Sequence, residues 1–266
     1  MMIKYYDETN CRLVYVGQEA NENFWDSRWQ AEDFERLIKV AIKKNRFFVD
    51  NTQKYLPPGS RILEGGCGRG DKVYVLQKCG FEAYGVDYAS ETVEKINRYA
   101  PELKVTLGDV RNLDFPDAYF DGYWSLGVIE HFYDGFEPIQ REMSRVIKNG
   151  GYLFLTVPAM SWLRKQKARL RKYPAYKEND ELRKHFYQFA LDPQRVIRHF
   201  QNHGFRFIEL KPRNGIVGLR EETAWPPLQR VLDSKTILAK RARKVIDILT
   251  TPFANHGVFC VFKKTQ

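Results

Sequence analysis

Residues 61–70 read Arg-Ile-Leu-Glu-Gly-Gly-Cys-Gly-Arg-Gly, and this stretch determines the expected fold. An apolar strand is predicted to end near Leu63, where the acid Glu64 follows it. Alternate glycines come next: Gly66, Gly68 and Gly70. A helical pattern begins near Asp71. Glycine has no Cβ and tolerates positive φ, so such a loop can pass close beneath a ligand. A glycine loop between a strand and a helix indicates nucleotide binding, although an ordinary tight turn would look the same.

Two later segments end in acids at a regular distance from this loop. Residues 82–87 and residues 104–109 both read as short strands, which end at Asp87 and Asp109. In a parallel α/β sheet the carboxyl ends of the strands lie along one edge, and ligands bind there. We therefore expect the carboxylates of Glu64, Asp87 and Asp109 to lie along one crevice.

An acid followed by a GxGxG loop resembles the first motif of the class I S-adenosylmethionine-dependent methyltransferases. The resemblance covers residues 60–160 well and the flanks more loosely. A dinucleotide dehydrogenase would prefer a glycine at position 71, where this chain has an aspartate. The resemblance implies S-adenosylmethionine as the cofactor. Asp87 would then accept hydrogen bonds from both ribose hydroxyls, Asp109 would accept one from the adenine amino group, and Glu64 would lie near the cationic amine. The residues expected to bind the cofactor are Glu64, Gly66, Gly68, Gly70, Asp87, Tyr88, Asp109, Val110, Leu126 and Gly127.

Strands and helical patterns alternate along the chain, which predicts a parallel sheet with right-handed crossovers. We expect a Rossmann-like α/β fold: a seven-stranded, mostly parallel sheet with helices on both faces and an antiparallel last strand. The later strands are predicted at residues 120–128, 151–157, 205–210 and 257–262. Residues 1–59 are expected to form an N-terminal helical cap packed on the core, although residues 12–16 suit a short strand. Residues 60–266 would form the methyltransferase domain, with a basic, lid-like insertion at about 158–185.

The predicted fourth strand runs into Ser-Leu-Gly-Val-Ile-Glu-His-Phe at residues 125–132. This segment resembles the Glu-His segment of small-molecule methyltransferases, including the quinone O-methyltransferases. His131 is the candidate catalytic base because a histidine titrates near neutrality, but a histidine that only packs the loop would leave the same pattern. The quinone enzymes carry an acid three residues before the glutamate, proposed to bind a metal together with Glu-His. Gly127 occupies that position here, so we predict no metal site.

Residues 24–29, Phe-Trp-Asp-Ser-Arg-Trp, place two tryptophans around an arginine. Two interpretations are open: a helix that packs on the sheet, or a flap over the cofactor or acceptor. Aromatic faces attract cations such as a sulfonium, which is the basis of the second interpretation. Trp25, Arg28 and Trp29 are therefore candidate substrate or lid residues. His185 joins them, because it follows the basic insertion and is a second candidate base.

Lys and Arg outnumber Asp and Glu by 43 to 33, which gives a net charge of +10. Such an excess attracts nucleic acid, an anionic membrane surface or an acidic substrate, or is simply a solvated basic surface. Basic residues concentrate at 164–172, which suits a lid or a solvated helix. They concentrate again at 230–244, in an amphipathic helix. That helix either lies on a membrane interface or packs its apolar face on its own sheet, and we expect the packing. The apolar face consists of Leu228, Val231, Leu232, Leu238, Ala242, Val245, Ile246 and Leu249.

Motifs of the nucleic-acid methyltransferases are missing. The chain has no Asn-Pro-Pro-aromatic tetrapeptide at the predicted fourth strand and no Pro-Cys pair, and Glu130 lacks the partner that arginine methyltransferases carry. Nucleic acid is therefore not the expected partner. We expect in-line transfer of a methyl group to a small-molecule or glycan acceptor, at a hydroxyl oxygen. The alternatives are a lipid-linked acceptor at a membrane surface, or a non-catalytic nucleotide- or RNA-binding protein.

No apolar run approaches the roughly 20 residues of a membrane-spanning helix, and the first residues lack the apolar core of a signal peptide. The cysteines, at positions 11, 67, 79 and 260, form no CxxC pair, which suits a reducing compartment. These features predict a cytoplasmic protein. They leave its oligomeric state open.

Overall fold

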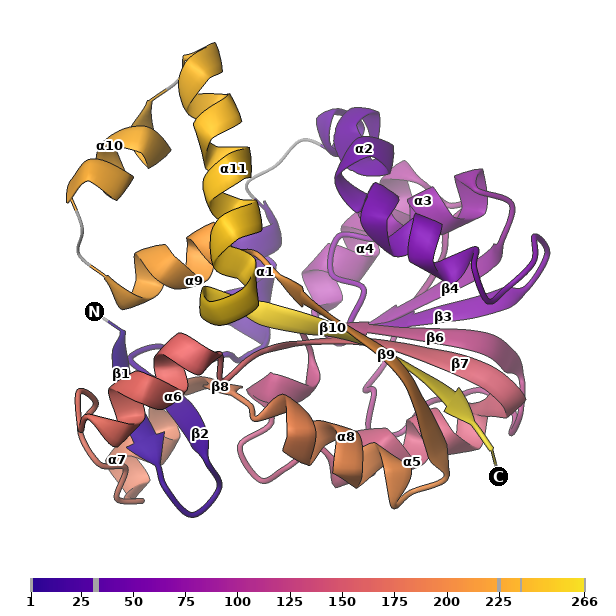
Figure 1. The fold of residues 1–266 in the computed structure, drawn as a ribbon. Coiled ribbons are helices and arrows are strands. Elements are labelled where there is room, and N and C mark those ends of the chain that lie inside the picture. The colour runs from indigo at the N-terminus through magenta and orange to yellow at the C-terminus, as the bar shows by residue number, and fades with distance from the viewer. Residues whose placement is uncertain (1, 31–33, 224–225, 235, 266) are drawn as a thin grey trace.

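The computed structural model describes residues 2–30, 34–223, 226–234 and 236–265 (Figure 1). Within these residues, seven strands form a central sheet in the order β5-β4-β3-β6-β7-β10-β9. They are β3 (Arg61–Gly65), β4 (Glu82–Asp87), β5 (Lys104–Leu107), β6 (Phe120–Leu126), β7 (Ile147–Pro158), β9 (Phe205–Arg213) and β10 (Gly257–Lys264). β3 to β7 pair in parallel, whereas β10 is antiparallel to β7 and β9. This confirms the predicted Rossmann-like α/β sheet and its antiparallel last strand.

Side chains of each strand alternate between the two faces of this sheet, and each face buries its own apolar core. On β3, for example, Ile62 belongs to the core shared with α2, α3 and α4, while Leu63 belongs to the core shared with α5 and α8. These helices are α2 (Phe34–Thr52), α3 (Asp71–Lys78), α4 (Ser90–Tyr99), α5 (Glu137–Val146) and α8 (Pro193–Gln201). Figure 1 shows the first three on one side of the sheet and the other two on the opposite side.

A second, smaller sheet forms from segments that lie far apart in the chain. Strands β1 (Ile3–Asp7), β2 (Arg12–Val16) and β8 (Phe186–Ala190) pair antiparallel in the order β1-β2-β8. The sequence predicts β2 but not β1, because β1 has no clean alternation of buried and exposed positions. The N-terminal segment therefore holds a hairpin as well as helices. Its division from the rest of the chain at residue 59 remains a prediction.

The remaining elements lie on the left of Figure 1, beyond the sheet. They are α1 (Glu22–Gln30), the short 3₁₀ turn η1 (Ile129–His131), α6 (Trp162–Arg169), α7 (Asp180–Lys184), α9 (Gly215–Glu222), α10 (Pro226–Asp233) and α11 (Ile237–Ala254). β7 ends at Pro158 and α6 begins at Trp162, so this is the side on which the parallel strands end. Ligands of α/β sheets bind on that side.

The expectation that α11 packs its large apolar residues on the sheet is wrong. Leu238, Val245 and Leu249 are exposed. The helix instead packs tightly on α9, where a Cβ at Gly218 would lie 1.8 Å from the carbonyl oxygen of Ala254. The apolar pattern correctly predicts a helix with two faces, but the close contact uses the face with small residues.

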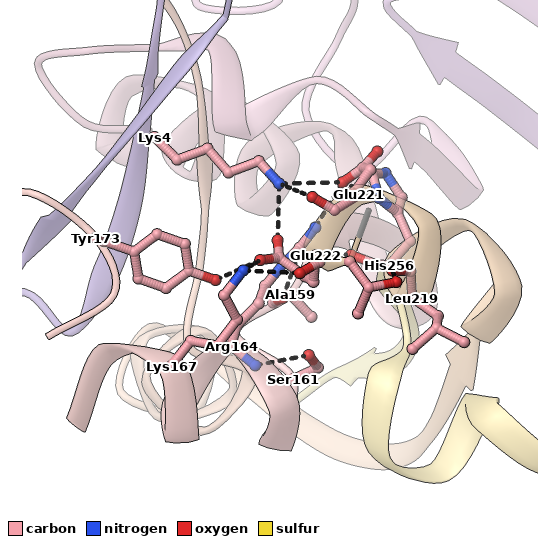
Figure 2. Close-up of polar contacts among 11 residues, drawn as sticks. Lys4, Ala159, Ser161, Arg164, Lys167, Tyr173, Leu219, Glu221, Glu222 and His256 are labelled. Atoms are coloured by element: carbon pink, nitrogen blue, oxygen red, sulfur yellow. Dashed lines mark hydrogen bonds and ion pairs between the residues drawn. The ribbon is translucent and has the colours of Figure 1, made fainter. Parts of the chain in front are cut away.

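Charged side chains from separate segments meet in one buried cluster (Figure 2). At its centre is the buried Glu222, at the end of α9. Its carboxylate accepts hydrogen bonds of 2.6–3.1 Å from Lys4, Arg164, Lys167 and Tyr173. Arg164 is fully buried and also donates to the carbonyl oxygens of Ala159 and His256. The interpretation of residues 164–172 as a solvated helix is therefore wrong for Arg164, and the cluster ties α6 and α9 to β1.

Candidate functional site

A cavity of about 550 Å³ opens at the edge of the central sheet. The loops that follow β3, β4, β5 and β6 line it, together with α1 and the segment just before that helix. This volume lies in the range of small-molecule and cofactor sites. The cavity is therefore where the sequence places the ligand.

The glycine loop forms the floor of the cavity. Gly66 and Gly68 line it, with φ of +74° and +49°, in the left-handed region that favours glycine. A Cβ on Gly66 would lie 2.6 Å from a methyl carbon of Val128, which leaves no room for a larger residue. Gly70 also has a positive φ, but it lies at the start of α3 behind the cavity wall.

The acid at the end of β4 faces the cavity as predicted. Asp87 Oδ2 accepts a hydrogen bond of 2.7 Å from the Gly68 amide, and Oδ1 accepts one of 3.0 Å from the Ala89 amide. Burial raises the pKa of Asp87, and these amide hydrogen bonds act against that rise. Each carboxylate oxygen keeps lone pairs for a ligand hydroxyl. Tyr88 lines the cavity beside Asp87, and its hydroxyl donates to the Ala20 carbonyl oxygen at 3.1 Å.

Glu64 lies behind the cavity wall rather than on its surface. Its side chain is fully buried, and Lys72, which does line the cavity, places its Nζ 3.0 Å from Glu64 Oε1. Neither carboxylate oxygen has a hydrogen-bond partner of good geometry among the described residues. Burial raises the pKa of Glu64 to about 7, although Lys72 opposes this. Lys72 was not predicted, although its place two residues after the last glycine could have drawn attention to it.

Asp109 carries a partner that the sequence reasoning missed. Arg111, two residues further on, donates to both oxygens of Asp109 at 2.6–3.0 Å, and both residues line the cavity. Burial works against ionisation of Asp109, but the hydrogen bonds from Arg111 outweigh it and lower its pKa. Val110, Leu126 and Gly127 line the cavity as predicted. This part of the site thus holds an ionised carboxylate and a guanidinium next to apolar surface.

Helix α1 is held over the cavity by its two acids. Asp26 Oδ1 accepts hydrogen bonds from the amide and the hydroxyl of Thr92, at 2.9 and 2.7 Å, and Glu22 Oε1 accepts one of 2.6 Å from the Ser90 hydroxyl. Thr92 and Ser90 lie in the first turn of α4, where the helix dipole favours negative charge. The structure therefore places Trp25, which lines the cavity, on a helix that is anchored to the core.

The other candidate lid residues do not line the cavity. Arg28 lies on the exposed side of α1, with its guanidinium 5.8 Å from the Phe24 ring centre. His185 is exposed just after α7, and no residue of the insertion 158–185 is among the lining residues. The side chain of Trp29 lies outside the described residues.

His131 lines the cavity and is partly buried. Its Nδ1 lies 2.7 Å from the Tyr187 carbonyl oxygen, and a carbonyl only accepts, so Nδ1 carries the hydrogen and Nε2 keeps its lone pair. The rings of Trp25 and Tyr187 contact it edge-on, with centres 5.0 and 5.1 Å away. Burial, together with the nearby Arg28, lowers the pKa of His131 to about 4. The imidazole is therefore neutral at physiological pH, with a free acceptor nitrogen.

Glu130 is buried next to His131 but does not line the cavity. Burial raises its pKa to about 8, so the group is a protonated carboxylic acid at neutral pH. Among the described residues, no group of three His, Cys, Asp or Glu side chains is arranged to hold a metal ion.

Comparison with known proteins agrees with this geometry. Residues 63–155, from β3 into β7, match the protein-family model described as "Methyltransferase domain". The matched segment is a methyltransferase domain of the class I S-adenosylmethionine-dependent type. It contains the glycine loop, Asp87, Asp109 and His131, so the family match and the cavity coincide.

Relatives of this methyltransferase include enzymes named for small-molecule acceptors. The 27-O-demethylrifamycin SV methyltransferase of Amycolatopsis mediterranei is 27% identical over 195 residues, which are 67% of this chain and 68% of that protein. The 2-methyl-6-phytyl-1,4-hydroquinone methyltransferase of Synechocystis is 34% identical over 102 residues, 37% of this chain and 32% of that protein. The matched segment thus spans about a third of the second relative's length.

A solved structure shares the fold of this methyltransferase over most of its length. The putative sarcosine dimethylglycine methyltransferase from Galdieria sulphuraria superposes with a TM-score of 0.57 at 14% identity, over 92% of this chain and 98% of that one. At this identity the likeness concerns the fold alone.

Proposed function

We propose that this methyltransferase binds S-adenosylmethionine in the cavity below α1 and transfers its methyl group to a hydroxyl oxygen of a small-molecule or glycan acceptor. The residues present fit this cofactor. Asp87 offers carboxylate lone pairs to the ribose hydroxyls, and Gly66 allows the backbone to approach the ligand closely. Glu64 lies behind the cavity wall and is paired with Lys72, so its carboxylate would act on the cationic amine at the other end of the molecule through its charge and not by direct contact.

The polar edge at Asp109 and Arg111 would hold the base of the cofactor. Asp109 is ionised and can accept a hydrogen bond from an adenine amino group, while Arg111 fixes the direction of its carboxylate. Val110 and Leu126 supply apolar surface beside it. When bound, the cofactor supplies a methyl group on a positively charged sulfur. The chain's own residues then have to align the acceptor, and alignment alone can be worth about 7–11 kcal/mol.

His131 is the observation that carries the choice of a hydroxyl acceptor. Its Nε2 is an unprotonated acceptor on a residue that lines the cavity, which is what an attacking hydroxyl needs for its proton. The aromatic rings of Trp25 and Tyr187 contact this imidazole edge-on. The names of the relatives, which specify a hydroquinone and a rifamycin, support a small organic acceptor.

The proposal is tested by incubating the purified protein with S-adenosylmethionine and a panel of acceptors, and by measuring release of S-adenosylhomocysteine. The panel contains phenols, hydroquinones, sugars and fatty acids, with unmodified transfer RNA as a separate arm. Turnover of at least one hydroxyl-bearing small molecule is the expected result. Turnover of transfer RNA alone would refute the proposal, as would cofactor binding without transfer to any acceptor.

A lipid-linked acceptor at a membrane surface is the second candidate. The exposed apolar residues of α11, beside its exposed cations, favour it. In the same assay, an acceptor presented in vesicles would then be methylated faster than the same acceptor dispersed in detergent. Equal rates would remove this candidate.

A further inference from the structure

Helix α11 presents a continuous apolar strip to solvent. Five of its large apolar side chains are between 55% and 78% exposed. They are Ile237, Leu238, Val245, Ile248 and Leu249. Spacings of three, four, seven and eleven place these residues on one side of a helix with 3.6 residues per turn. A soluble helix normally turns such a strip inward.

The opposite side of α11 is already occupied. A Cβ at Gly215 would lie 2.1 Å from the Thr251 amide nitrogen, so the backbones of α9 and α11 are in direct contact there. Asp247 also points to this side, because its Oδ1 accepts a hydrogen bond of 3.0 Å from the Ile216 amide. The apolar strip is therefore not a misplaced inner face. Within the described part of the chain, α11 packs its inner side on α9, and the apolar strip lies on its other side.

Cations lie beside the strip and, at Arg241, within it. Lys240, Arg241 and Lys244 are exposed on α11, and Asp247 is the only acid in the helix. Because Asp247 is turned toward α9, the outer side of the helix carries positive charge without compensation from its own residues. If a second copy of the chain bound this side of α11 symmetrically, the cations of the two copies would face and repel one another. An anionic surface would neutralise them.

The helix is also preformed. The Thr236 hydroxyl accepts a hydrogen bond of 3.2 Å from the Ala239 amide and caps its start. Arg243 donates to the carbonyl oxygens of Leu232 and Ser234, at 2.7 and 3.2 Å, which fixes the connection to α10. Figure 1 shows α10 and α11 projecting away from the central sheet. The strip thus lies on a capped helix that protrudes from the sheet.

We propose that the outer side of α11 docks this protein on an anionic membrane surface, with the apolar strip at the boundary between headgroups and acyl chains and the cations on the headgroup phosphates. An apolar strip bordered by Lys and Arg is the pattern of helices that lie in a membrane interface. No helix among the described residues is long and apolar enough to cross a bilayer, so the contact is peripheral. This inference goes beyond the methyl transfer proposed above and does not depend on it.

The test is co-sedimentation of the full chain with vesicles. One set is pure phosphatidylcholine, and the other contains about a third phosphatidylglycerol, which gives an anionic surface. The unmodified protein is expected to sediment with the anionic vesicles only, and less as salt is raised. Failure to bind the anionic vesicles would overturn the proposal, as would equal binding to both sets.

Two pairs of variants test whether vesicle binding depends on the apolar strip and its cations or only on the overall positive charge of the protein. Leu249→Glu is expected to lower vesicle affinity at least about tenfold. It removes an apolar group that would be buried in the membrane when the protein is bound, and it adds a negative charge that the anionic surface repels. Its control is Tyr99→Glu on α4, which makes the same kind of change at a site of matching exposure, 69% against 66%, and should leave binding unchanged. Arg241→Gln with Lys244→Gln should cost about fivefold for each cation. The control for that pair removes two exposed cations from the other basic stretch, Arg171→Gln with Lys172→Gln.

Two further outcomes would overturn the proposal. If a variant on α11 and its control elsewhere lose the same amount of vesicle binding, the attraction is diffuse and α11 is not the docking element. If light scattering shows a dimer that Leu249→Glu converts to a monomer, and vesicles do not bind, the strip is covered by a second copy. Circular dichroism and thermal melting confirm that each variant is folded, which is expected because all the substituted side chains are exposed.

Discussion

Replacing Glu222 by glutamine tests the buried charged cluster of Figure 2. The substitution keeps the size of the side chain but leaves Lys4, Arg164 and Lys167 without their shared negative charge. Burial alone would raise the pKa of Glu222, but Lys4, Lys167 and Tyr173 outweigh burial and hold that pKa at about 2. The gap from the ordinary value of 4.5, at about 1.36 kcal/mol per pH unit, corresponds to about 3 kcal/mol. Removing one partner of a buried ion pair costs about 3–5 kcal/mol in general, which agrees.

The assay is urea unfolding of both proteins, followed by circular dichroism at a series of pH values. At pH 7 the free energy of unfolding should be about 3 kcal/mol lower for Glu222→Gln. A carboxylate with a lowered pKa stabilises the fold above its unfolded pKa and loses that contribution as the pH falls toward its folded pKa. The difference between the two proteins should therefore shrink between pH 4.5 and pH 2, because the protonated glutamate comes to resemble glutamine.

Two results would refute this reasoning. One is a loss below about 1 kcal/mol at pH 7, the level of an exposed ion pair. The other is a difference that stays constant with pH, which would mean that the charge of Glu222 is not the source. The control is Glu94→Gln, whose partner Arg98 lies 2.6 Å away on the surface of α4 with both side chains more than 60% exposed. That variant should lose at most about 0.5 kcal/mol.

Other predictions concern the cavity. Asp87→Ala should lower the affinity for S-adenosylmethionine at least about a hundredfold, because two charge-assisted hydrogen bonds to the cofactor are lost. Circular dichroism should show that the variant is folded. An unchanged affinity in calorimetry would contradict the assignment of Asp87. His131→Asn should lower turnover about 10²- to 10⁴-fold with the cofactor affinity unchanged. Because burial lowers the pKa of His131 to about 4, activity of the unmodified protein should be flat from pH 6 to pH 8 and fall as the imidazole protonates near pH 4. A midpoint near 6.5 would show that the pKa of His131 is not lowered. Asp26→Asn should weaken the attachment of α1 by about 1–2 kcal/mol, seen as faster amide hydrogen exchange in residues 22–30 with no change in α8.

The cofactor side of the site could be read from the sequence because its signals are local. Alternate glycines after a strand constrain the backbone directly, and the acid at the end of a parallel strand has only one edge to occupy. The seven strands were therefore predicted correctly, and most of the residues expected at the cofactor site line the cavity. Glu64 and Gly70 are the exceptions, because both lie behind the cavity wall, where the packing of α3 and not the motif sets their position.

What the sequence did not predict depends on partners that are distant along the chain. The basic residues of 164–172 read as a solvated helix because the acid that buries Arg164 lies 58 positions away, in α9. β1 was missed although its partner β2 was predicted, because the third strand of their sheet, β8, lies far along the chain at Phe186–Ala190. The apolar side of α11 was assigned to the sheet because periodicity identifies a face and says nothing about its neighbour.

The distance between Lys4 and Glu222, 218 positions along the chain, has a consequence for how the protein is made. At roughly 5–20 residues per second, a ribosome needs roughly 10–40 s to produce the second residue after the first. The N-terminal hairpin thus leaves the exit tunnel first and acquires its ionic partners among the last. Until then Lys4 must stay hydrated, and the edge of β2 that pairs with β8 must stay unpaired.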